Sequence, residues 1–308
     1  MNFTKTKTIT IGIPTLNRQK YLKNTVLNII ENTISAVIDI IIVDQTSDRN
    51  VINENKVYFN SLNFNIKYIY LEIPSVCKAR NTIIQESKSD IVYFIDDDIL
   101  LTKNTLLSHL YLYENSTVVS TIGKIYNRLN NFDLEQLDIH KPEIGTIENF
   151  PNENIIDTNF KGSGISCNQT YLRKVLLEIN GFDENFIGGY YEDADIVNRI
   201  RKREYKIGFN PKASILHLKA PMGGLRFDKI QPISFHKKFY SFLFYYVRNF
   251  KFTIKYLLEF YKVLRAGPLM KQNIFTFRNG IFLWIKLPFY IFKSVKNKNI
   301  IISLLNSK

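Results

Sequence analysis

The 308-residue chain contains only two cysteines, Cys77 and Cys167. Two cysteines cannot form a disulfide framework, and they lack the paired spacing of a zinc site. This composition fits a reducing, cytosolic setting. The chain also lacks an uninterrupted run of about 18 apolar residues, so we expect no membrane-spanning helix. Its first residues, MNFTKTKTITIGIP, lack the apolar core of a signal peptide, so we expect none.

Internal repeats, low-complexity blocks and a GxGxxG nucleotide fingerprint are also missing. Without that fingerprint after the first predicted strand, a dinucleotide-binding oxidoreductase fits poorly. Apolar residues, in contrast, are plentiful at 45% of the chain. This content is enough for one large domain with a core, or for a domain plus an appendage.

Positive charge is concentrated at the C-terminal end. Residues 229–308 contain 15 Lys and Arg and a single acid, Glu259, whereas residues 1–228 contain 26 basic and 27 acidic residues. The change follows the turn-rich APMGG at 220–224. We therefore predict a domain over residues 1–228 and a separate basic, aromatic region over residues 229–308.

Short apolar segments alternate with segments of helical periodicity in the first part of the chain. The predicted strands are residues 8–13, 37–43, 66–71 and 91–95, and the predicted helices are residues 21–30, 75–87 and 101–113. We expect Pro14 to end the first strand and Asn17 to cap the first helix. This alternation predicts an α/β fold with a parallel sheet and crossover helices. Ligands of such sheets bind at the carboxyl ends of the strands.

Three consecutive acids, Asp96, Asp97 and Asp98, follow the apolar strand at 91–95. If the chain stays extended, Asp96 and Asp98 point to one side and Asp97 points away. Two converging carboxylates suit a divalent cation such as Mg²⁺ or Mn²⁺, which would offset their mutual repulsion. From spacing alone, an acidic loop that caps the next helix stays equally open.

A second acidic cluster lies in GGYYEDADIVNRIRKREY, residues 188–205. Its apolar residues recur at helical spacing, which places Glu192 and Asp193 in the first turn of a helix. The helix dipole alone favours acids there. The preceding glycine pair and two aromatic residues favour a further interpretation, in which a carboxylate accepts a proton from a hydroxyl.

His217, in ASILHLKAP, alternates with Ile215 in an apolar stretch. A single histidine in a strand is more often structural than a ligand. Because His217 follows the acidic helix, a metal-ligand function is the alternative.

Seven short motifs follow one another along the chain, and their order is more specific for a protein family than any single motif. They are IGIPTLNR, IIIVDQTSD, CKARN, FIDDD, GSGISCNQTYLRKVLLEINGFDENF, GGYYEDADIVNRIRKREYKIGFNP and ILHL. This order resembles family 2 glycosyltransferases with the GT-A fold, of the bacterial surface-polysaccharide type, over roughly residues 8–220. The resemblance implies a GT-A-like, Rossmann-type, mostly parallel sheet flanked by helices. It also implies a nucleotide-sugar half at about 1–122 and an acceptor half at about 123–228.

The resemblance implies a donor site at the ends of the first strands. Pro14, Thr15 and Asn17 would begin the nucleotide pocket. Asp44 would lie near the base or ribose, and Arg80 would approach the base or the diphosphate.

The same resemblance implies the metal and acid–base groups. Asp98 would hold Mg²⁺ or Mn²⁺ on the diphosphate, Asp96 would reach the ribose or the metal, and His217 would be an additional ligand. Asp97 would belong to the donor-binding set. In the second cluster, Asp193 would be the general base, and Glu192 would orient the acceptor.

One position departs from the family pattern. Many members carry two acids after the second strand, whereas this chain has Asp44 followed by Gln45. The second position is often assigned to pairing with a uracil edge. An amide can donate and accept, so it could still recognise a pyrimidine. The donor is therefore left open among UDP-, dTDP- and GDP-linked sugars.

The implied activity is that of an inverting, metal-dependent glycosyltransferase. It would transfer a sugar to a hydroxyl of a glycan or lipid-linked acceptor in cell-surface polysaccharide biosynthesis. A nucleotidyltransferase with a related sheet is one alternative, and a catalytically silent GT-A-like binding or scaffold protein is another.

The C-terminal region is predicted to be helical, basic and aromatic. Arg248, Lys251, Lys255 and Lys262 would form a basic stripe amid Phe and Tyr. The pattern favours attachment to an anionic membrane surface, hence a cytoplasmic protein held peripherally at the inner face of the membrane.

Other partners of this region are possible from the pattern. Its aromatic residues could instead bury against the catalytic domain or against a second copy, giving a homo-oligomer. The apolar stretch at 281–292 is too short to span a bilayer and contains Pro288. No nucleic-acid motif accompanies the charge, so we expect no nucleic-acid partner.

Overall fold

The computed structural model describes residues 7–33, 38–127, 155–220, 223–224, 232–249 and 296. It divides into two compact units. The sheet unit comprises Met1–Glu184 and Ile196–Lys229, and the tail unit comprises Asn185–Asp195 and Ile230–Lys308. The predicted division into 1–228 and 229–308, with its two halves, stays a prediction.

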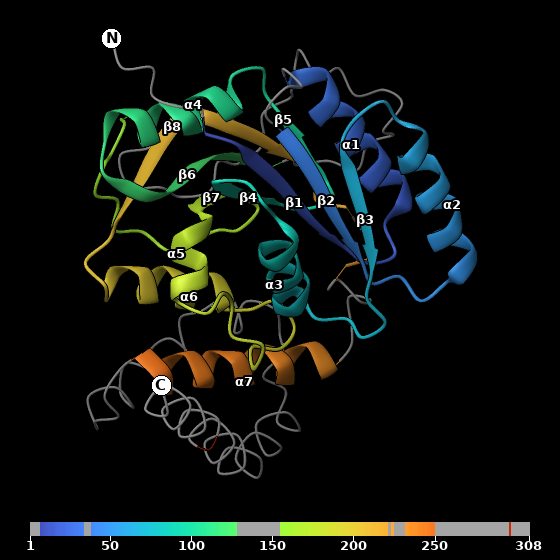
Figure 1. Cartoon of the computed structure of the whole chain (residues 1–308). Helices are drawn as coiled ribbons and strands as arrows, with labels where there is room; N and C mark the ends of the chain where they lie inside the picture. Colours follow the sequence, from blue (N-terminus) through green and yellow to red (C-terminus); the bar gives the residue numbers. More distant parts are fainter. Residues whose placement is uncertain are drawn as a thin grey trace. The chain divides into compact units, whose positions relative to one another are not determined.

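One eight-stranded sheet forms the centre of the sheet unit, in the order β3-β2-β1-β4-β7-β6-β8-β5 (Figure 1). Its first four strands are β1 (Ile9–Thr15), β2 (Ile38–Asp44), β3 (Ile66–Tyr70) and β4 (Ile91–Ile95). They pair in parallel, and their buried Ile and Val runs are typical of strands covered on both faces. These four strands were predicted from the sequence, and they are confirmed.

The second half of the sheet is mixed. Its strands are β5 (Ile99–Leu101), β6 (Val118–Asn127), β7 (Asn168–Leu172) and β8 (Lys206–His217). Strand β7 runs antiparallel to both β4 and β6, whereas β8 runs parallel to β6 and antiparallel to β5. The short strand β5 thereby sets the end of β8 beside the residues that follow β4.

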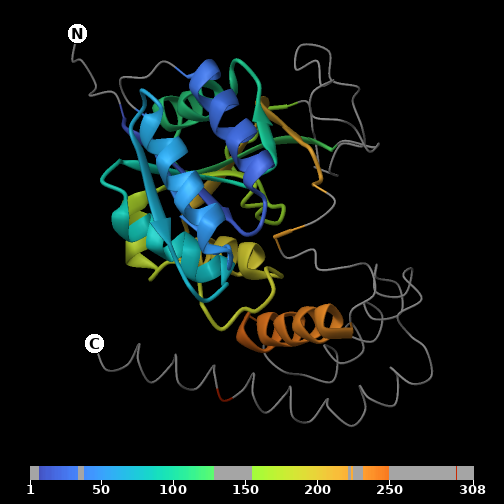
Figure 2. The same ribbon diagram turned by 90° about the vertical axis from the view of Figure 1, so that its right-hand side faces the viewer.

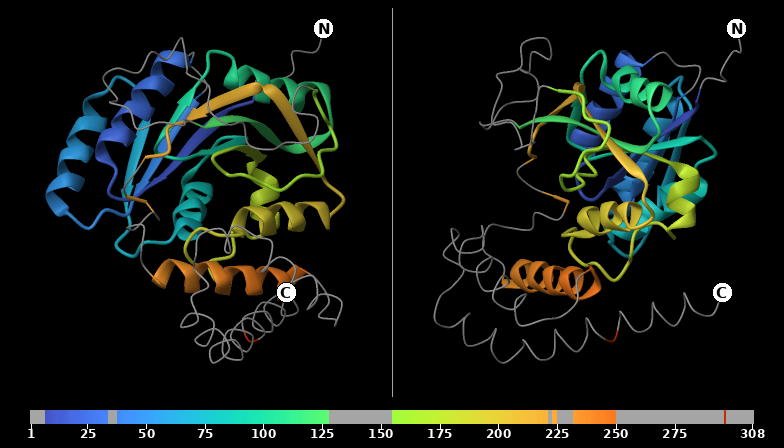
Figure 3. Two further views of the ribbon diagram at one scale, coloured as in Figure 1. Left: turned by 180° about the vertical axis from the view of Figure 1, so that it is seen from behind. Right: turned by 90° about the vertical axis from the view of Figure 1, so that its left-hand side faces the viewer.

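Helices flank the sheet within the sheet unit (Figures 2 and 3). They are α1 (Gln19–Asn32), α2 (Arg49–Ser61), α3 (Val76–Glu86), α4 (Thr105–Asn115) and α5 (Arg173–Glu178). Helix α6 (Glu192–Arg201) begins in the tail unit, and α7 (Pro232–Asn249) belongs to the tail unit. Helix α3 packs on β1 and β2, and α4 packs on β6 and β8. Figure 1 shows α1 and α2 on the opposite side of the sheet from α3, as right-handed crossovers require when the strand order reverses.

Three local expectations were wrong. Pro14 lies within β1, where it pairs with Val43. Beyond Gly12, β1 pairs with β2 alone, so the missing N–H of proline faces no partner strand. Asn17 does not cap α1, because its φ of 55° places it in the left-handed region and Arg18 is the N-cap.

The helix expected at 101–113 begins only at Thr105. Residues 99–101 pair with β8 and form β5 instead. A three-residue apolar segment has too little periodicity to distinguish a strand from a helix start.

The described part of the tail unit contains α7. The side chains of Tyr240, Phe242 and Phe244 are buried, so these rings pack within the protein. Lys251, Lys255, Lys262 and the stretch 281–292 lie outside the described residues. No described helix combines the length and the apolar character that crossing a bilayer requires.

Candidate active site

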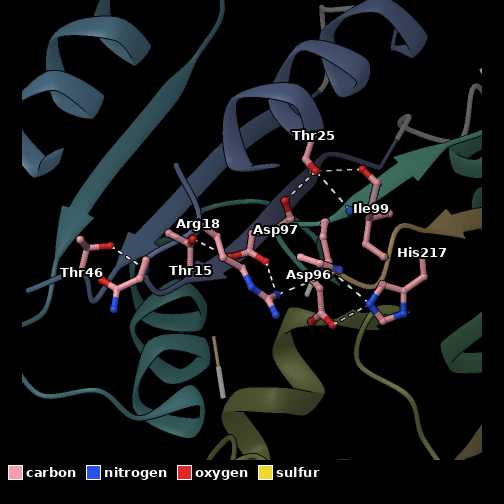
Figure 4. Close-up of polar contacts among 11 residues, drawn as sticks. Thr15, Arg18, Thr25, Thr46, Asp96, Asp97, Ile99 and His217 are labelled. Atoms are coloured by element: carbon pink, nitrogen blue, oxygen red, sulfur yellow. Dashed lines mark hydrogen bonds and ion pairs between the residues drawn. The ribbon is translucent and has the colours of Figure 1, made fainter. Parts of the chain in front are cut away.

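The acidic triplet forms the connection between β4 and β5, and a threonine from α1 fixes its path (Figure 4). Thr25 Oγ1 lies 2.8 Å from the Asp97 carbonyl oxygen and 2.9 Å from that of Ile99, one of which accepts its proton. The same oxygen accepts the Ile99 N–H at 3.2 Å. Because Thr25 is fully buried, this turn is held rigidly.

Asp96, Asp98 and His217 converge on one point. Each offers a ligand atom, and these atoms all lie within 4.8 Å of one another. His217 Nε2 is 3.2 Å from Asp98 Oδ1 and 3.9 Å from Asp96 Oδ2. The antiparallel pairing of Ile99 with His217 brings the histidine to the triplet. The structure therefore brings together the three residues predicted as metal ligands.

Two of these ligand atoms fit a cation well. Asp98 Oδ1 and His217 Nε2 are buried, and neither has a hydrogen-bond partner with acceptable geometry among the described residues. Buried polar atoms without partners are uncommon and costly. Two carboxylates and an imidazole form a donor set suited to a divalent cation. The residues present therefore fit Mg²⁺ or Mn²⁺.

Asp98 is stabilised as an anion. Burial alone would raise its pKa, but the neighbouring His217, the Arg18 guanidinium and the Ala220 N–H together lower the pKa below the ordinary range. The Ala220 N–H donates to Asp98 Oδ2 at 2.8 Å, and Arg18 Nη1 lies 3.6 Å from the same oxygen. These neighbours favour the ionised form of Asp98, which is the form that a cation ligand requires.

The chain does not stay extended past β4, because Asp97 and Asp98 lie in a turn, so the expected alternation of the three acids is wrong. Asp97 nevertheless stays outside the cluster of Asp96, Asp98 and His217. Thr15 Oγ1 donates to its Oδ2 at 2.6 Å, and Arg18 Nη1 donates to its Oδ1 at 2.8 Å. Burial raises the pKa of Asp97 to about 7, with the Arg18 charge opposing this rise and the Asp98 charge adding to it. The middle acid of the triplet therefore orders the loop at the end of β1.

A cavity of about 210 Å³ opens beside the triplet. It lies at the carboxyl ends of β1, β2 and β4, where parallel sheets bind ligands. The lining residues are Pro14, Thr15, Leu16, Arg18, Gln45, Pro74, Ser75, Val76, Asp96, Asp97 and Gly224. Five residues predicted to bind the donor are among them: Pro14, Thr15, Gln45, Asp96 and Asp97.

Three other predicted donor residues, Asn17, Asp44 and Arg80, are not among the described residues that line the cavity. The carboxylate of Asp44 is fully buried and accepts from the Thr46 N–H, from Asn55 and from Tyr68. The Asn17 N–H donates to Thr46 Oγ1 at 2.9 Å. Their contact with a donor stays a prediction.

Arg80 has its own environment on α3. Its side chain is buried, and its guanidinium lies 5.1 Å from the centre of the Phe182 ring. The cation–π contact orients the guanidinium.

The amide of Gln45 has a fixed orientation. Its Nε2 donates to the carbonyl oxygens of Ile73 and Ser75, at 3.1 and 3.2 Å. An amide nitrogen carries two protons, so both are used. Oε1 is the polar atom that Gln45 can offer to a ligand in the cavity.

The second predicted cluster begins α6. Glu192 and Asp193 occupy the first turn, and the apolar face of Ile196, Val197 and Ile200 is fully buried. Glu192 is buried and Asp193 is half-buried. These two acids belong to the tail unit, and each unit is described by itself.

Residues 10–179 match the family model described as glycosyl transferase family 2. This match covers more than half of the 308 residues. The chain belongs to glycosyl transferase family 2. The resemblance of the sequence to this family is therefore confirmed, and membership favours a glycosyltransferase over a nucleotidyltransferase or a silent scaffold.

A curated relative supports the assignment. The family 2 chain is 22% identical over 139 residues to "Uncharacterized glycosyltransferase YfnE" of Bacillus subtilis (strain 168). The alignment covers 44% of this chain and 34% of the relative, so the chain spans about a third of that protein's length.

Solved structures show the same fold. GalNAc-T7, crystallised with UDP, GalNAc and Mn²⁺, superposes with a TM-score of 0.55 at 16% identity, over 70% of this chain and 44% of that one. Staphylococcus aureus TarS 1–349 in complex with UDP gives 0.54 at 15% identity, over 85% and 73%. The α/β fold with a mostly parallel sheet is that of the GT-A glycosyltransferases.

Sequence reasoning missed two parts of this family 2 site. Arg18, whose side chain is 8% exposed, bridges Asp97 and Asp98. Gly223 and Gly224, interpreted as part of a boundary turn, have φ of 78° and 60° and lie against Arg18. Arg18 could have been found from its position, because it follows Asn17 directly in IGIPTLNR, at the sheet edge where the acidic triplet also lies. Three acids at one edge need a positive charge nearby to offset their repulsion.

Proposed function

We propose that this family 2 glycosyltransferase is an inverting, metal-dependent enzyme. It moves a sugar from a nucleoside-diphosphate sugar to a hydroxyl of a glycan or lipid-linked acceptor in cell-surface polysaccharide biosynthesis. The observation that carries the proposal is the convergence of two buried atoms, Asp98 Oδ1 and His217 Nε2, with Asp96 beside the cavity. The UDP and Mn²⁺ named with the GalNAc-T7 structure, and the UDP named with TarS, support it.

Asp96, Asp98 and His217 would hold Mg²⁺ or Mn²⁺. A cation bound there offsets the negative charge that builds on the departing diphosphate. Arg18 and the Ala220 N–H keep Asp98 ionised and oriented for that purpose. Thr25 fixes the backbone between β4 and β5, so the carboxylates are positioned before the donor arrives.

Asp193 acts on the acceptor in this proposal. Its carboxylate takes the proton of the attacking hydroxyl, and Glu192 orients the acceptor. The hydroxyl oxygen bonds to the anomeric carbon as the bond to the diphosphate breaks on the opposite face, which inverts the configuration. One base suffices, because a diphosphate leaves without a proton from an acid, whereas glycoside hydrolysis needs two carboxyl groups.

Gln45 would recognise the base of the donor. Its two amide protons bond to the carbonyls of Ile73 and Ser75, so it can only accept a hydrogen bond from a ligand. Uracil, thymine and guanine present a ring N–H and complement this acceptor. Cytosine presents an unprotonated ring nitrogen at the same edge, so CDP-linked sugars fit poorly.

The C-terminal region would hold the enzyme at the cytoplasmic face of a membrane. Residues 229–308 carry 15 Lys and Arg against one acid, although Arg248 forms an ion pair with the buried Asp195. Each basic residue near an anionic surface contributes about 1 kcal/mol. Since Tyr240, Phe242 and Phe244 are buried, the attachment would depend on charge more than on these rings. Release of the protein from membranes by high salt tests this part, and a fully soluble distribution at low salt argues against it.

A panel of nucleotide sugars with Mn²⁺, Mg²⁺ or EDTA tests the reaction. We expect a UDP-, dTDP- or GDP-sugar to raise the melting temperature and to release nucleoside diphosphate, and EDTA to abolish both effects. Equal turnover after chelation, and with Asp96 and Asp98 both replaced by alanine, contradicts the proposal. Release of pyrophosphate would instead indicate a nucleotidyltransferase.

A further inference from the structure

Residues 185–195, which lead into α6, adopt an unusual backbone. Gly188 and Gly189 have φ of 75° and 65°, and Tyr191 has φ of 68°. A bulky residue such as tyrosine rarely occupies the left-handed region, and it stays there only when its surroundings hold it. Tyr191 directly precedes Glu192 and Asp193, so whatever holds Tyr191 also sets the direction of this acidic turn.

The backbone of this segment is held by a serine of α7. Ser241 Oγ accepts the Ile187 N–H at 3.1 Å and donates to the Ile187 carbonyl oxygen at 2.8 Å. Ser241 is fully buried. The Ser241 side chain therefore satisfies both the N–H and the carbonyl group of Ile187. Ile187 directly precedes Gly188 and Gly189, whose backbone is conformationally the most permissive.

The first turn of α6 is held by an ion pair. Arg248 Nε lies 2.9 Å from Asp195 Oδ1, and Asn249 Nδ2 donates to the same oxygen at 3.0 Å. Asp195 is fully buried, and the Arg248 side chain is 14% exposed. Asp195 lies two residues after Asp193 in the same helical turn, so Arg248 anchors the turn that carries the candidate base.

Aromatic rings complete the support. Tyr191 stacks on Tyr245 at 5.5 Å and meets Phe242 edge-on at 5.4 Å. Phe186 meets Phe244 at 4.8 Å. Aromatic pairs at these separations are favourable beyond the area that they bury.

We infer that α7 is a positioning element for the acidic turn of α6, with Ser241 and Arg248 as its positioning residues. The inference rests on the proposed function of Asp193 as the general base. It assigns the C-terminal region a catalytic purpose apart from membrane attachment. Neither residue would touch the substrate, since both act through the backbone and through Asp195.

The experiment uses the full-length chain with Ser241→Ala, Arg248→Gln and Arg248→Lys. Transfer is measured with a nucleotide sugar that the wild-type protein turns over, and amide exchange of residues 185–195 is followed by mass spectrometry. Ser116→Ala is a matched control, because it removes a hydroxyl that bonds the Leu112 carbonyl at the end of α4.

We expect Ser241→Ala and Arg248→Gln to lower kcat about tenfold, a small part of the 10²–10⁴ that a positioned base contributes. The donor KM should stay within about twofold, because the donor residues lie outside the altered contacts. Exchange at 185–195 should become faster, and Arg248→Lys should restore most of kcat. Ser116→Ala should behave like the wild type.

Unchanged kcat in Ser241→Ala and Arg248→Gln despite faster exchange would overturn the inference. So would a rise in donor KM as large as the loss in kcat, because that result indicates general damage. If Asp193→Asn transfers sugar normally, the proposed base is wrong. The exchange data then still decide whether α7 holds this segment, so the two failures are distinguishable.

Discussion

His217 Nε2 lies 3.2 Å from Asp98 Oδ1, and both atoms are buried. They come from segments more than a hundred residues apart, and the pairing of β5 with β8 places them together. Their approach lacks the geometry of a hydrogen bond within the described structure, whereas two ligands of one cation need no such geometry. This relationship makes the metal proposal directly testable.

Replacement of His217 by alanine should weaken Mn²⁺ binding by about 100-fold or more, since even groups that only orient metal ligands are worth about 10- to 100-fold. Asp98→Asn should have a similar effect, because it removes the charge and keeps an acceptor for the Ala220 N–H. Calorimetric titration of Mn²⁺ in the presence of UDP measures both.

Asp48→Ala is a suitable control for these variants. It removes an exposed acid at the start of α2 and should leave Mn²⁺ affinity unchanged. Wild-type affinity in His217→Ala would remove the histidine from the ligand set.

Arg18 and Asp97 form a buried pair, with side chains 8% and 3% exposed. Arg18→Gln should destabilise the protein by about 3–5 kcal/mol, because it leaves buried carboxylates without a counter-charge. The double variant Arg18→Gln, Asp97→Asn should recover part of that loss. Denaturant unfolding of the wild type, the single variants Arg18→Gln and Asp97→Asn, and the double variant gives the coupling energy. Additive effects would show that Arg18 does not stabilise Asp97.

The sequence was sufficient to predict the first four strands and the spatial meeting of Asp96, Asp98 and His217. The strands are buried apolar runs, so local composition specifies them. The family resemblance implied that these three residues share a metal site, and the rule for ligand sites in parallel sheets placed the acidic triplet at the binding edge.

Other features depended on contacts between distant segments. Arg18 reaches Asp97 because the left-handed Asn17 redirects the chain between β1 and α1. Thr25, inside α1, bonds to a turn that lies more than seventy residues further along the chain. Neither contact leaves a periodic pattern in the local sequence. The contacts by which α7 holds the first turn of α6 also join segments distant in the sequence, so they leave no such pattern either. The strand β5 was missed because three residues are too few to show a period.

His109 should make stability depend on pH. Its ring is fully enclosed and contacts Thr121, Asn168 and Tyr93. Burial lowers its pKa from 6.5 to about 4, although the bond to Asn168 opposes this shift. The native state therefore binds fewer protons than the unfolded state, and stability is lost as pH falls from 6.5 towards 4.

The expected loss between pH 7.5 and pH 5 is about 2 kcal/mol, from 1.36 kcal/mol per pKa unit. Urea unfolding at these two values measures it. His109→Gln should be less stable at pH 7.5 but should show a smaller difference between the two values. An unchanged pH dependence in this variant would assign the effect to other groups.

Gly223→Ala should damage the donor site through Arg18. The glycine has φ of 78°, and an added Cβ would lie 2.6 Å from Arg18 Cγ and 2.7 Å from the Asn17 carbonyl oxygen. A side chain at this φ costs about 1–3 kcal/mol, and the backbone oxygen cannot rotate away. We expect a loss of stability in that range and weaker UDP binding, because Arg18 lines the cavity. Thermal unfolding and UDP titration with Mn²⁺ measure the two effects. Unchanged UDP affinity in a folded Gly223→Ala protein would show that the packing of this glycine on Arg18 does not shape the donor site.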